Sequence, residues 1–292
     1  MLKIYPDTET IRAQWPALLQ FCQELHQQFD QSGTVLFDSR NTIRRYELEG
    51  TPLIVKRYKR PNLLSGIGYG MQRNSKAHKA LRNGLELIRR GFRTPCPYAA
   101  VEVWSQGGLR LGECYYLCGE CTAPLDLAKT LNDPVTPDPE VARRFAFYAA
   151  ELHKKGVMMV DLNSTNVLFD PKDFQETDPA KWFQLIDINR MSFLHDEKQD
   201  EFSLSQRLEN LTRFTGKLEV FRLVARHYAE AYGMPIEEFE RQAVARKLKH
   251  DKMWRMRKRI THPIKNRHYG DPPQPSLLRE GESNEESVKS KE

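Results

Sequence analysis

Two carboxylates and an amide occur in this chain at a spacing that suits phosphoryl-transfer chemistry. Asp161 and Asn166 lie five residues apart between apolar runs, and Asp187 ends a further apolar run downstream. An aspartate in such a loop can accept the proton of an attacking hydroxyl. Amide and carboxylate oxygens are the hard ligands that Mg²⁺ requires. We therefore expect Asp161 to act as a catalytic base, and Asn166 with Asp187 to hold Mg²⁺ against the phosphates of ATP.

A lysine upstream can supply a matching positive charge. Lys56 ends the apolar run 53–55, which follows turn residues and is typical of a strand. A lone lysine at a strand end often does no more than reach solvent. Here it precedes Asp161, Asn166 and Asp187 in the order that kinases use, so we predict that its ammonium binds the ATP phosphates.

The order of the predicted elements indicates two lobes. Residues 7–29 predict a helix that kinks or restarts at Pro16, and strand patterns then recur up to residue 118 around one helix that starts after Ser75. Helical patterns dominate after a candidate hinge at 119–121. We therefore expect an α+β, two-lobed protein-kinase-like fold with five strands and one main helix in the small lobe and a larger helical lobe. The expected parts are an N-terminal helical extension (1–30), the small lobe (31–118), the large lobe with a basic C-terminal helix (119–268) and a disordered tail (269–292).

Composition favours a globular enzyme. The chain has 292 residues, of which 39% are hydrophobic and 29% charged. No apolar run approaches the roughly 20 residues that a transmembrane helix needs, and the N-terminus lacks a signal-peptide pattern. The five cysteines fit free thiols, and Cys114 and Cys118 alternate with apolar residues as strand residues do, rather than as zinc ligands. We expect a cytoplasmic protein.

The net charge of +6 is concentrated near the C-terminus. Residues 241–267 contain eleven Lys or Arg and one acid, Asp251. A solvated helix would account for this pattern, and so would contact with an anionic inner membrane, an anionic glycolipid or nucleic acid. Charge alone does not separate these partners. Nucleic acid is the least expected of them, because no aromatic-rich recognition motif accompanies the charge.

In detail the chain resembles the lipopolysaccharide core kinase family, whose members phosphorylate Kdo or heptose in Gram-negative bacteria. The matching motifs lie within about residues 30–230 and are Arg40-Asn41, Val55-Lys56, Pro61-Asn62, Ser75-Lys76-Ala77, Gly91, Thr94-Pro95, Pro97, Leu152-His153, Gly156, Asp161-Leu162, Asn166 and Ile186-Asp187-Ile188-Asn189-Arg190. The resemblance implies an ATP- and Mg²⁺-dependent transferase acting on a sugar hydroxyl of lipopolysaccharide core. A protein acceptor is less expected, because Asn163 stands where protein kinases carry a lysine. Fold-level analogy alone does not identify the substrate.

Three departures from the kinase pattern leave an alternative open. Met159 stands where kinases usually have a histidine, two residues before the catalytic aspartate. The slot for the helix glutamate that pairs with the strand lysine lies near Arg82, so Glu86, one turn further on, is the predicted substitute at the nucleotide site. No Gly-x-Gly-x-x-Gly motif precedes Lys56, and the backbone amides of residues 37–41 would have to cover the phosphates. A pseudokinase, or a nucleotide-binding scaffold without transfer activity, would also fit these departures.

Overall fold

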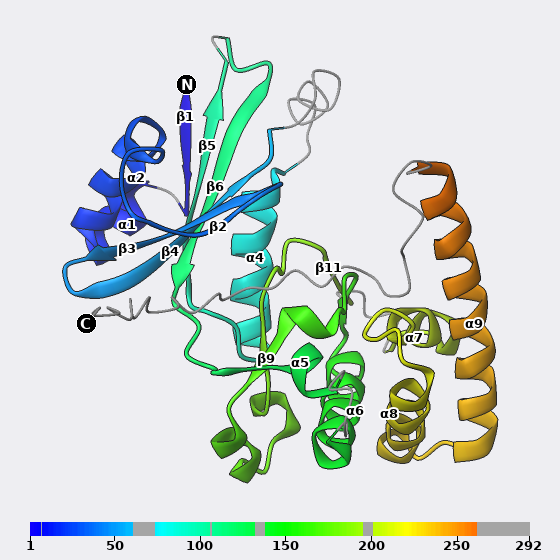
Figure 1. Cartoon of the computed structure of the whole chain (residues 1–292). Helices are drawn as coiled ribbons and strands as arrows, with labels where there is room; N and C mark the ends of the chain where they lie inside the picture. The colour runs from blue at the N-terminus through cyan, green and yellow to red at the C-terminus, as the bar shows by residue number, and fades with distance from the viewer. Residues whose placement is uncertain (7, 61–73, 106, 132–137, 195–200, 262–292) are drawn as a thin grey trace, which may run out of the picture.

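The computed structural model describes residues 1–6, 8–60, 74–105, 107–131, 138–194 and 201–261. Within these residues a strand-rich small lobe lies beside a helical large lobe (Figure 1). The predicted tail and the Pro61-Asn62 motif lie outside the described residues.

The small lobe is built on a six-stranded antiparallel sheet. Its strands, in spatial order, are β1 (Leu2–Tyr5), β5 (Pro97–Trp104), β6 (Leu111–Gly119), β4 (Thr51–Tyr58), β3 (Thr42–Leu48) and β2 (Thr34–Asp38). The expectation of five strands was wrong by one, because β1 pairs with the edge of β5. Four residues are too few to show an alternating pattern, and this strand depends on its partner rather than on its own sequence.

The two faces of the sheet pack against different helices. Side chains alternate along a strand, so Leu53 and Val55 point to one face of β4 and Lys56 to the other. Helices α1 (Thr8–Gln14) and α2 (Pro16–Gln28) cover the first face, where Leu53 and Val55 join a separate hydrophobic cluster. The predicted N-terminal helix therefore restarts at its proline and packs on the small lobe. Lys56 is left on the face that meets the large lobe.

Helix α4 (Lys76–Arg89) covers the second face of the sheet. The hydroxyl of Ser75 caps it by accepting from the backbone N–H of His78 at 3.0 Å, and Gly91 follows it with φ 88°. Its buried residues are Ala77, Ala80, Leu81, Gly84 and Leu87. Leu85 and Ile88, although large and apolar, are exposed. The small residues let the helix approach the sheet closely and turn those larger side chains outward.

Strands β5 and β6 are consecutive and pair antiparallel as a hairpin. Cys114 and Cys118 lie in β6 as strand residues, and burial raises the pKa of their thiols to about 11 and about 12. After β6 the chain passes through residues 120–124 into the large lobe.

The large lobe combines helices with short strands. Its elements are β7 (Leu125–Asp126), α5 (Leu127–Leu131), α6 (Pro139–Lys154), β8 (Val157–Met159), the 3₁₀ turn η1 (Ser164–Asn166), β9 (Val167–Phe169), η2 (Pro171–Gln175), η3 (Pro179–Lys181), β10 (Gln184–Leu185), β11 (Met191–Phe193), α7 (Leu204–Leu211), α8 (Leu218–Tyr232) and α9 (Ile236–Thr261). Strands β9 and β10 pair across the segment 170–183, and β11 pairs with β8. Aromatic side chains from α6, α8 and the segments between them fill the core beneath these strands.

Helix α9 lies at the outer edge of the large lobe, against α7 and α8 (Figure 1). It includes most of the basic segment that begins at residue 241. Phe239, Ala243 and Val244 attach its first half to the lobe. Among the helices that the structure describes, none combines the length and the apolar run that crossing a bilayer requires.

Candidate active site

Backbone hydrogen bonds join the loop of Asp161 to the segment of Asp187. The N–H of Val160 donates to the carbonyl of Arg190, and the N–H of Ile186 donates to the carbonyl of Asn166, each at 2.9 Å. The two polar segments singled out in the sequence are therefore held side by side in the large lobe.

The carboxylate of Asp161 faces two arginines. Arg190 donates to it at 3.0 Å, and Arg213 approaches it at 3.8 Å. The side chain of Asp161 is 35% exposed, so an acceptor hydroxyl can reach its carboxylate from solvent. A base in this position has its negative charge balanced before any substrate binds.

The donor set of Asn166 and Asp187 fits a magnesium ion. The amide nitrogen of Asn166 donates to the backbone carbonyl of Asp161 at 3.2 Å, so its oxygen is the atom that can bind a cation. Asp187 has φ 54°, a left-handed conformation that non-glycine residues adopt at a cost and that often marks functional sites. Mg²⁺ commonly uses one or two protein oxygens, with phosphate oxygens and water completing its shell. Asn166 and Asp187 would supply the protein oxygens.

Lys56 crosses from the small lobe to this site. Its ammonium binds the carboxylate of Asp187 at 2.5 Å, and its side chain is 14% exposed. The strand alternation described above sends it to this face, since Val55 is buried on the opposite one. The structure thus brings together Lys56, Asp161, Asn166 and Asp187 from positions more than a hundred residues apart.

The prediction for Glu86 needs correction. Its carboxylate accepts hydrogen bonds from Arg89 and Arg90 at 2.6–2.7 Å, and these neighbours lower its pKa to about 2. Within the described residues it makes no ion pair with Lys56. Glu86 lies in the last turn of α4, where the two following arginines compete for it, and its role there is structural: it orients Arg90, which donates to backbone carbonyls of the large lobe.

Asn83 of α4 is a residue that sequence reasoning missed. Its amide donates to the backbone carbonyl of Ile188 at 2.7 Å, one residue after Asp187. It lies next to the slot in which a helix glutamate had been sought. Helix α4 therefore contacts the segment of Asp187 through a backbone carbonyl, and no sequence motif predicts this contact.

Lys76 is a second missed candidate. It is the first residue of α4, and its pKa is lowered by burial and by the nearby charge of Arg40, while the charges of Asp187 and Lys56 also reach it. The positive charges of Lys56 and Lys76 thus lie near the carboxylate of Asp187, an arrangement that suits a polyphosphate. The sequence feature that could have indicated Lys76 is its position immediately after Ser75, which caps the helix.

A buried network supports the loop where kinases use a histidine. Met159 is buried, and its backbone carbonyl accepts from the amide of Asn210 at 2.7 Å. The oxygen of that amide accepts from Nε2 of His153 at 3.0 Å, and Nδ1 of His153 accepts from the hydroxyl of Tyr228 at 2.7 Å. Burial lowers the pKa of His153 to about 4, so the ring is neutral. The network holds the strand that leads into Asp161 without using the side chain of Met159.

The fold is similar to that of solved structures. WaaP in complex with acyl carrier protein matches with a TM-score of 0.52 at 16% identity, over 89% of this chain and 98% of that one. The MAP kinase LmaMPK10 from Leishmania major matches with a TM-score of 0.34 at 14% identity, over 78% of this chain and 65% of that one. WbdD matches with a TM-score of 0.40 at 12% identity, over 71% and 48%.

No family model matches the sequence, and no curated protein matches it. The fold comparison depends on WaaP, whose TM-score exceeds 0.5. Together with the element order, it defines a two-lobed, α+β protein-kinase-like fold. The predicted fold class is confirmed, and the family resemblance inferred from the sequence motifs is confirmed at the level of the fold.

Proposed function

We propose that this protein is an ATP- and Mg²⁺-dependent kinase that transfers a phosphoryl group to a sugar hydroxyl of lipopolysaccharide core. The observation that carries the proposal is the contact between Lys56 and Asp187 across the cleft, beside the loop of Asp161 and Asn166. Each of these residues has a distinct task in phosphoryl transfer.

In the proposed reaction, Lys56 and Lys76 orient the nucleotide by binding its phosphates. Asp161 accepts the proton of the acceptor hydroxyl as the oxygen bonds to the γ-phosphorus, and the bond from that phosphorus to ADP breaks. Mg²⁺ bound by Asn166 and Asp187 would neutralise charge on the phosphates. Arg190, which binds Asp161 in this structure, holds the carboxylate in position.

The structure weakens two arguments for a pseudokinase. Met159 replaces a bracing histidine, but His153 and Asn210 hold the same strand through its backbone. The missing helix glutamate would have paired with Lys56, and Asp187 makes that pair instead. These contacts support an active site that is braced by different residues.

The choice of a glycolipid acceptor is supported by the sequence motifs and by charge on α9. Lys249, Lys252 and Arg255 are exposed there, and Met253 and Met256 are exposed beside them. A basic surface with apolar side chains suits a peripheral contact with the anionic inner membrane that carries such an acceptor.

Lys247 does not belong to that surface. It is buried, and its ammonium donates to the carbonyl of Thr212 at 3.0 Å and to Asp251 at 2.8 Å. The charge of this lysine attaches α9 to the large lobe.

The test is ATP turnover with Mg²⁺, measured with and without purified core glycolipid. The proposal expects ADP release that depends on the glycolipid, together with phosphate on a sugar of the product. Asp161→Asn serves as the inactive control. Nucleotide binding without turnover on any acceptor would instead favour the pseudokinase.

A further inference from the structure

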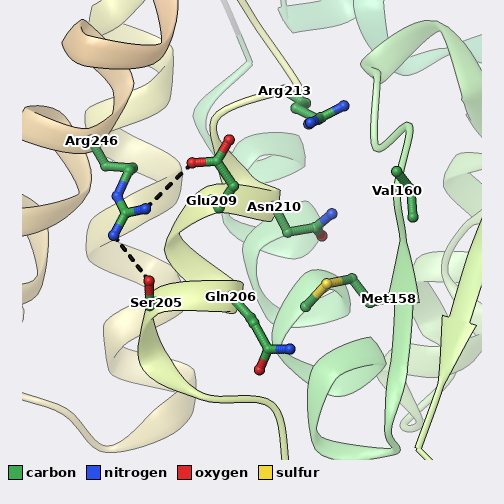
Figure 2. A pocket seen from close by; sticks show the side chains of 8 residues that line it. All are labelled: Met158, Val160, Ser205, Gln206, Glu209, Asn210, Arg213 and Arg246. Carbon is green, nitrogen blue, oxygen red and sulfur yellow. Dashed lines mark hydrogen bonds and ion pairs between the residues drawn. The ribbon is translucent and has the colours of Figure 1, made fainter.

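A pocket opens in the large lobe directly beside the proposed catalytic base. Its volume is about 390 Å³, within the roughly 300–1,000 Å³ typical of small-molecule sites. Its lining comes from the strand that leads to Asp161, from α7 and the turn after it, and from α9 (Figure 2). The lining residues are Met158, Val160, Ser205, Gln206, Glu209, Asn210, Arg213 and Arg246.

The pocket has an apolar side and a polar side. Met158 and Val160 form one wall, and the side chains of Gln206 and Asn210 face them in Figure 2. A sugar has the same division, since its ring presents C–H groups and its rim presents hydroxyls. Val160, in this wall, is the residue immediately before Asp161 in the sequence, and the contact between the pocket lining and the carboxylate of Asp161 is made by Arg213.

Arg213 connects the pocket to the base. It lines the pocket, and its guanidinium lies 3.8 Å from the carboxylate of Asp161. That carboxylate already has a closer partner in Arg190, at 3.0 Å. Arg213 is therefore not needed to neutralise Asp161, and its donors can turn toward a ligand.

The charges around the pocket do not balance. Arg246 approaches Glu209 at 3.5 Å and donates to the hydroxyl of Ser205 at 3.1 Å (Figure 2). With Asp161 matched by Arg190 and Glu209 matched by Arg246, the positive charge of Arg213 remains beside the reacting position. An anionic group on the acceptor would complete this arrangement, and arginine binds phosphate and carboxylate groups in a bidentate manner.

We propose that this pocket binds the acceptor and that Arg213, supported by Arg246, recognises a phosphate or carboxylate group carried by the acceptor sugar. The inference rests on the proposed function, because it concerns the acceptor side of the same site. It assigns the class of acceptor, an anionic sugar, and a residue that selects it.

Direct binding to the full-length protein tests the inference. Glucose 1-phosphate, glucuronate and glucose serve as probes in calorimetry, with the nucleotide cleft saturated by ADP and Mg²⁺ so that the probes cannot occupy it. We expect the two anionic probes to bind more tightly than glucose. Arg213→Gln should weaken their binding by about tenfold or more, as expected for loss of hydrogen bonds to a charged group, and should leave glucose almost unaffected.

Arg222→Gln is the matched control. It also removes an exposed guanidinium with a carboxylate partner, Glu240, but on α8, away from the pocket lining. Thermal unfolding of both variants shows whether either has lost its fold. Equal probe affinities for Arg213→Gln, Arg222→Gln and the wild type would overturn the inference.

An activity measurement separates the two proposals. If core glycolipid is phosphorylated, Arg213→Gln should raise its KM about tenfold while the KM for ATP stays within about twofold. A second outcome is that the glycolipid is phosphorylated at a rate that changes neither with Arg213→Gln nor with enzymatic removal of phosphate from the glycolipid. That result would overturn the proposed anion recognition in the pocket and would leave the kinase proposal intact. If no phosphoryl transfer is detected but probe binding still depends on Arg213, the kinase proposal is overturned and the anion-binding site is retained.

Discussion

Arg190 donates to Asp161 at 3.0 Å, and thereby joins the segment that carries one proposed metal ligand to the proposed base. The same two segments are joined through the backbone, since the carbonyl of Arg190 accepts from the N–H of Val160, the residue before Asp161. A shift in the segment of Asp187 therefore moves the partner of the base. If Asp161 is the base and Asp187 a metal ligand, the side chain of Arg190 would couple proton transfer to metal binding.

Asp161→Asn should abolish phosphoryl transfer and leave ATP binding nearly intact. The amide keeps the shape of the side chain but cannot accept the hydroxyl proton, so kcat should fall by about 100-fold or more. The measurement is steady-state turnover alongside calorimetric ATP affinity. Asp30→Asn, which removes an exposed carboxylate paired with Arg57, is the control. Turnover within a few-fold of the wild type would rule out the base assignment.

Asp187→Ala should weaken ATP binding in the presence of Mg²⁺ and leave ATP binding without Mg²⁺ almost unchanged. Loss of the carboxylate removes the negative ligand, and Asn166 supplies an oxygen but no charge. ATP affinity is compared with Mg²⁺ and with EDTA in both proteins. We expect a large Mg²⁺-dependent increment in the wild type and little in the variant. An increment of equal size in both would show that Asp187 is not a ligand.

Lys76→Met should lower ATP affinity by about tenfold at low salt, because it removes a half-buried charge that lies near Lys56 and Asp187. The loss should shrink at high salt. Lys79→Met is the matched control, since Lys79 lies on the same helix and is exposed. Equal affinities for the two variants would place Lys76 outside the nucleotide site.

The sequence predicted the polar groups better than the contacts that hold them. Asp161 and Asp187 follow short apolar runs, Asn166 precedes one, and Lys56 ends the apolar run 53–55, so local pattern was enough to select them. The roles of Asn83 and Asn210 could not be predicted, because each acts on a backbone carbonyl that any residue could supply. Such partners depend on how helices pack, and one sequence carries no signal for that.

Glu86 shows the opposite error. It was selected because it was the acid nearest to the expected slot, yet Arg89 and Arg90 stand within one turn of it. Oppositely charged residues three or four positions apart in a helix form ion pairs locally. Glu86 therefore binds Arg89 and Arg90 rather than the distant Lys56. Strand β1 was missed for a related reason, since pairing with β5 stabilises it from outside its own sequence.

His153 should make the protein sensitive to mild acid. Burial, and to a lesser extent the charge of Arg207, lower its pKa from 6.5 to about 4. Below pH 6.5 the unfolded chain therefore binds a proton that the folded chain excludes, and stability falls as the pH drops from 6.5 toward 4. By pH 5 the loss from this group should be about 2 kcal/mol.

Urea unfolding at pH 7 and pH 5 measures that loss. His153→Gln should be less stable than the wild type at pH 7, and the difference between the two proteins should shrink at pH 5 because the variant has no imidazole to protonate. His227→Gln is the control, since that ring binds Glu230 on a partly exposed helix face. A difference that stays constant with pH would show that His153 does not remain neutral in the folded protein.

Neutralising Lys249, Lys252 and Arg255 together should reduce binding to anionic vesicles. Each basic residue near such a surface contributes about 1 kcal/mol at most, so three contribute up to about 3 kcal/mol at low salt. Salt screens the effect over a Debye length of about 8 Å, and binding should converge at high salt. ATP affinity should not change.

A triple variant of Arg12, Lys129 and Lys172, all exposed and scattered over both lobes, changes the net charge equally and serves as the control. Co-sedimentation with anionic and with neutral vesicles is the measurement. Equal and negligible binding of the wild type to both would leave α9 as a solvated helix and the kinase proposal untouched.

The side chain of Arg90 attaches helix α4 of the small lobe to the large lobe. Its guanidinium donates to the carbonyls of Lys155, Gly156 and Leu194, so the last turn of α4 is anchored to the large lobe. The helix has 14 residues and is about 21 Å long, with Lys76 at the opposite end. A rotation of about 5° about the attachment at Arg90 would carry Lys76 through about 2 Å over that length. A small change in the tilt of α4 would therefore displace Lys76 more than the residues of the helix that lie nearer to Arg90.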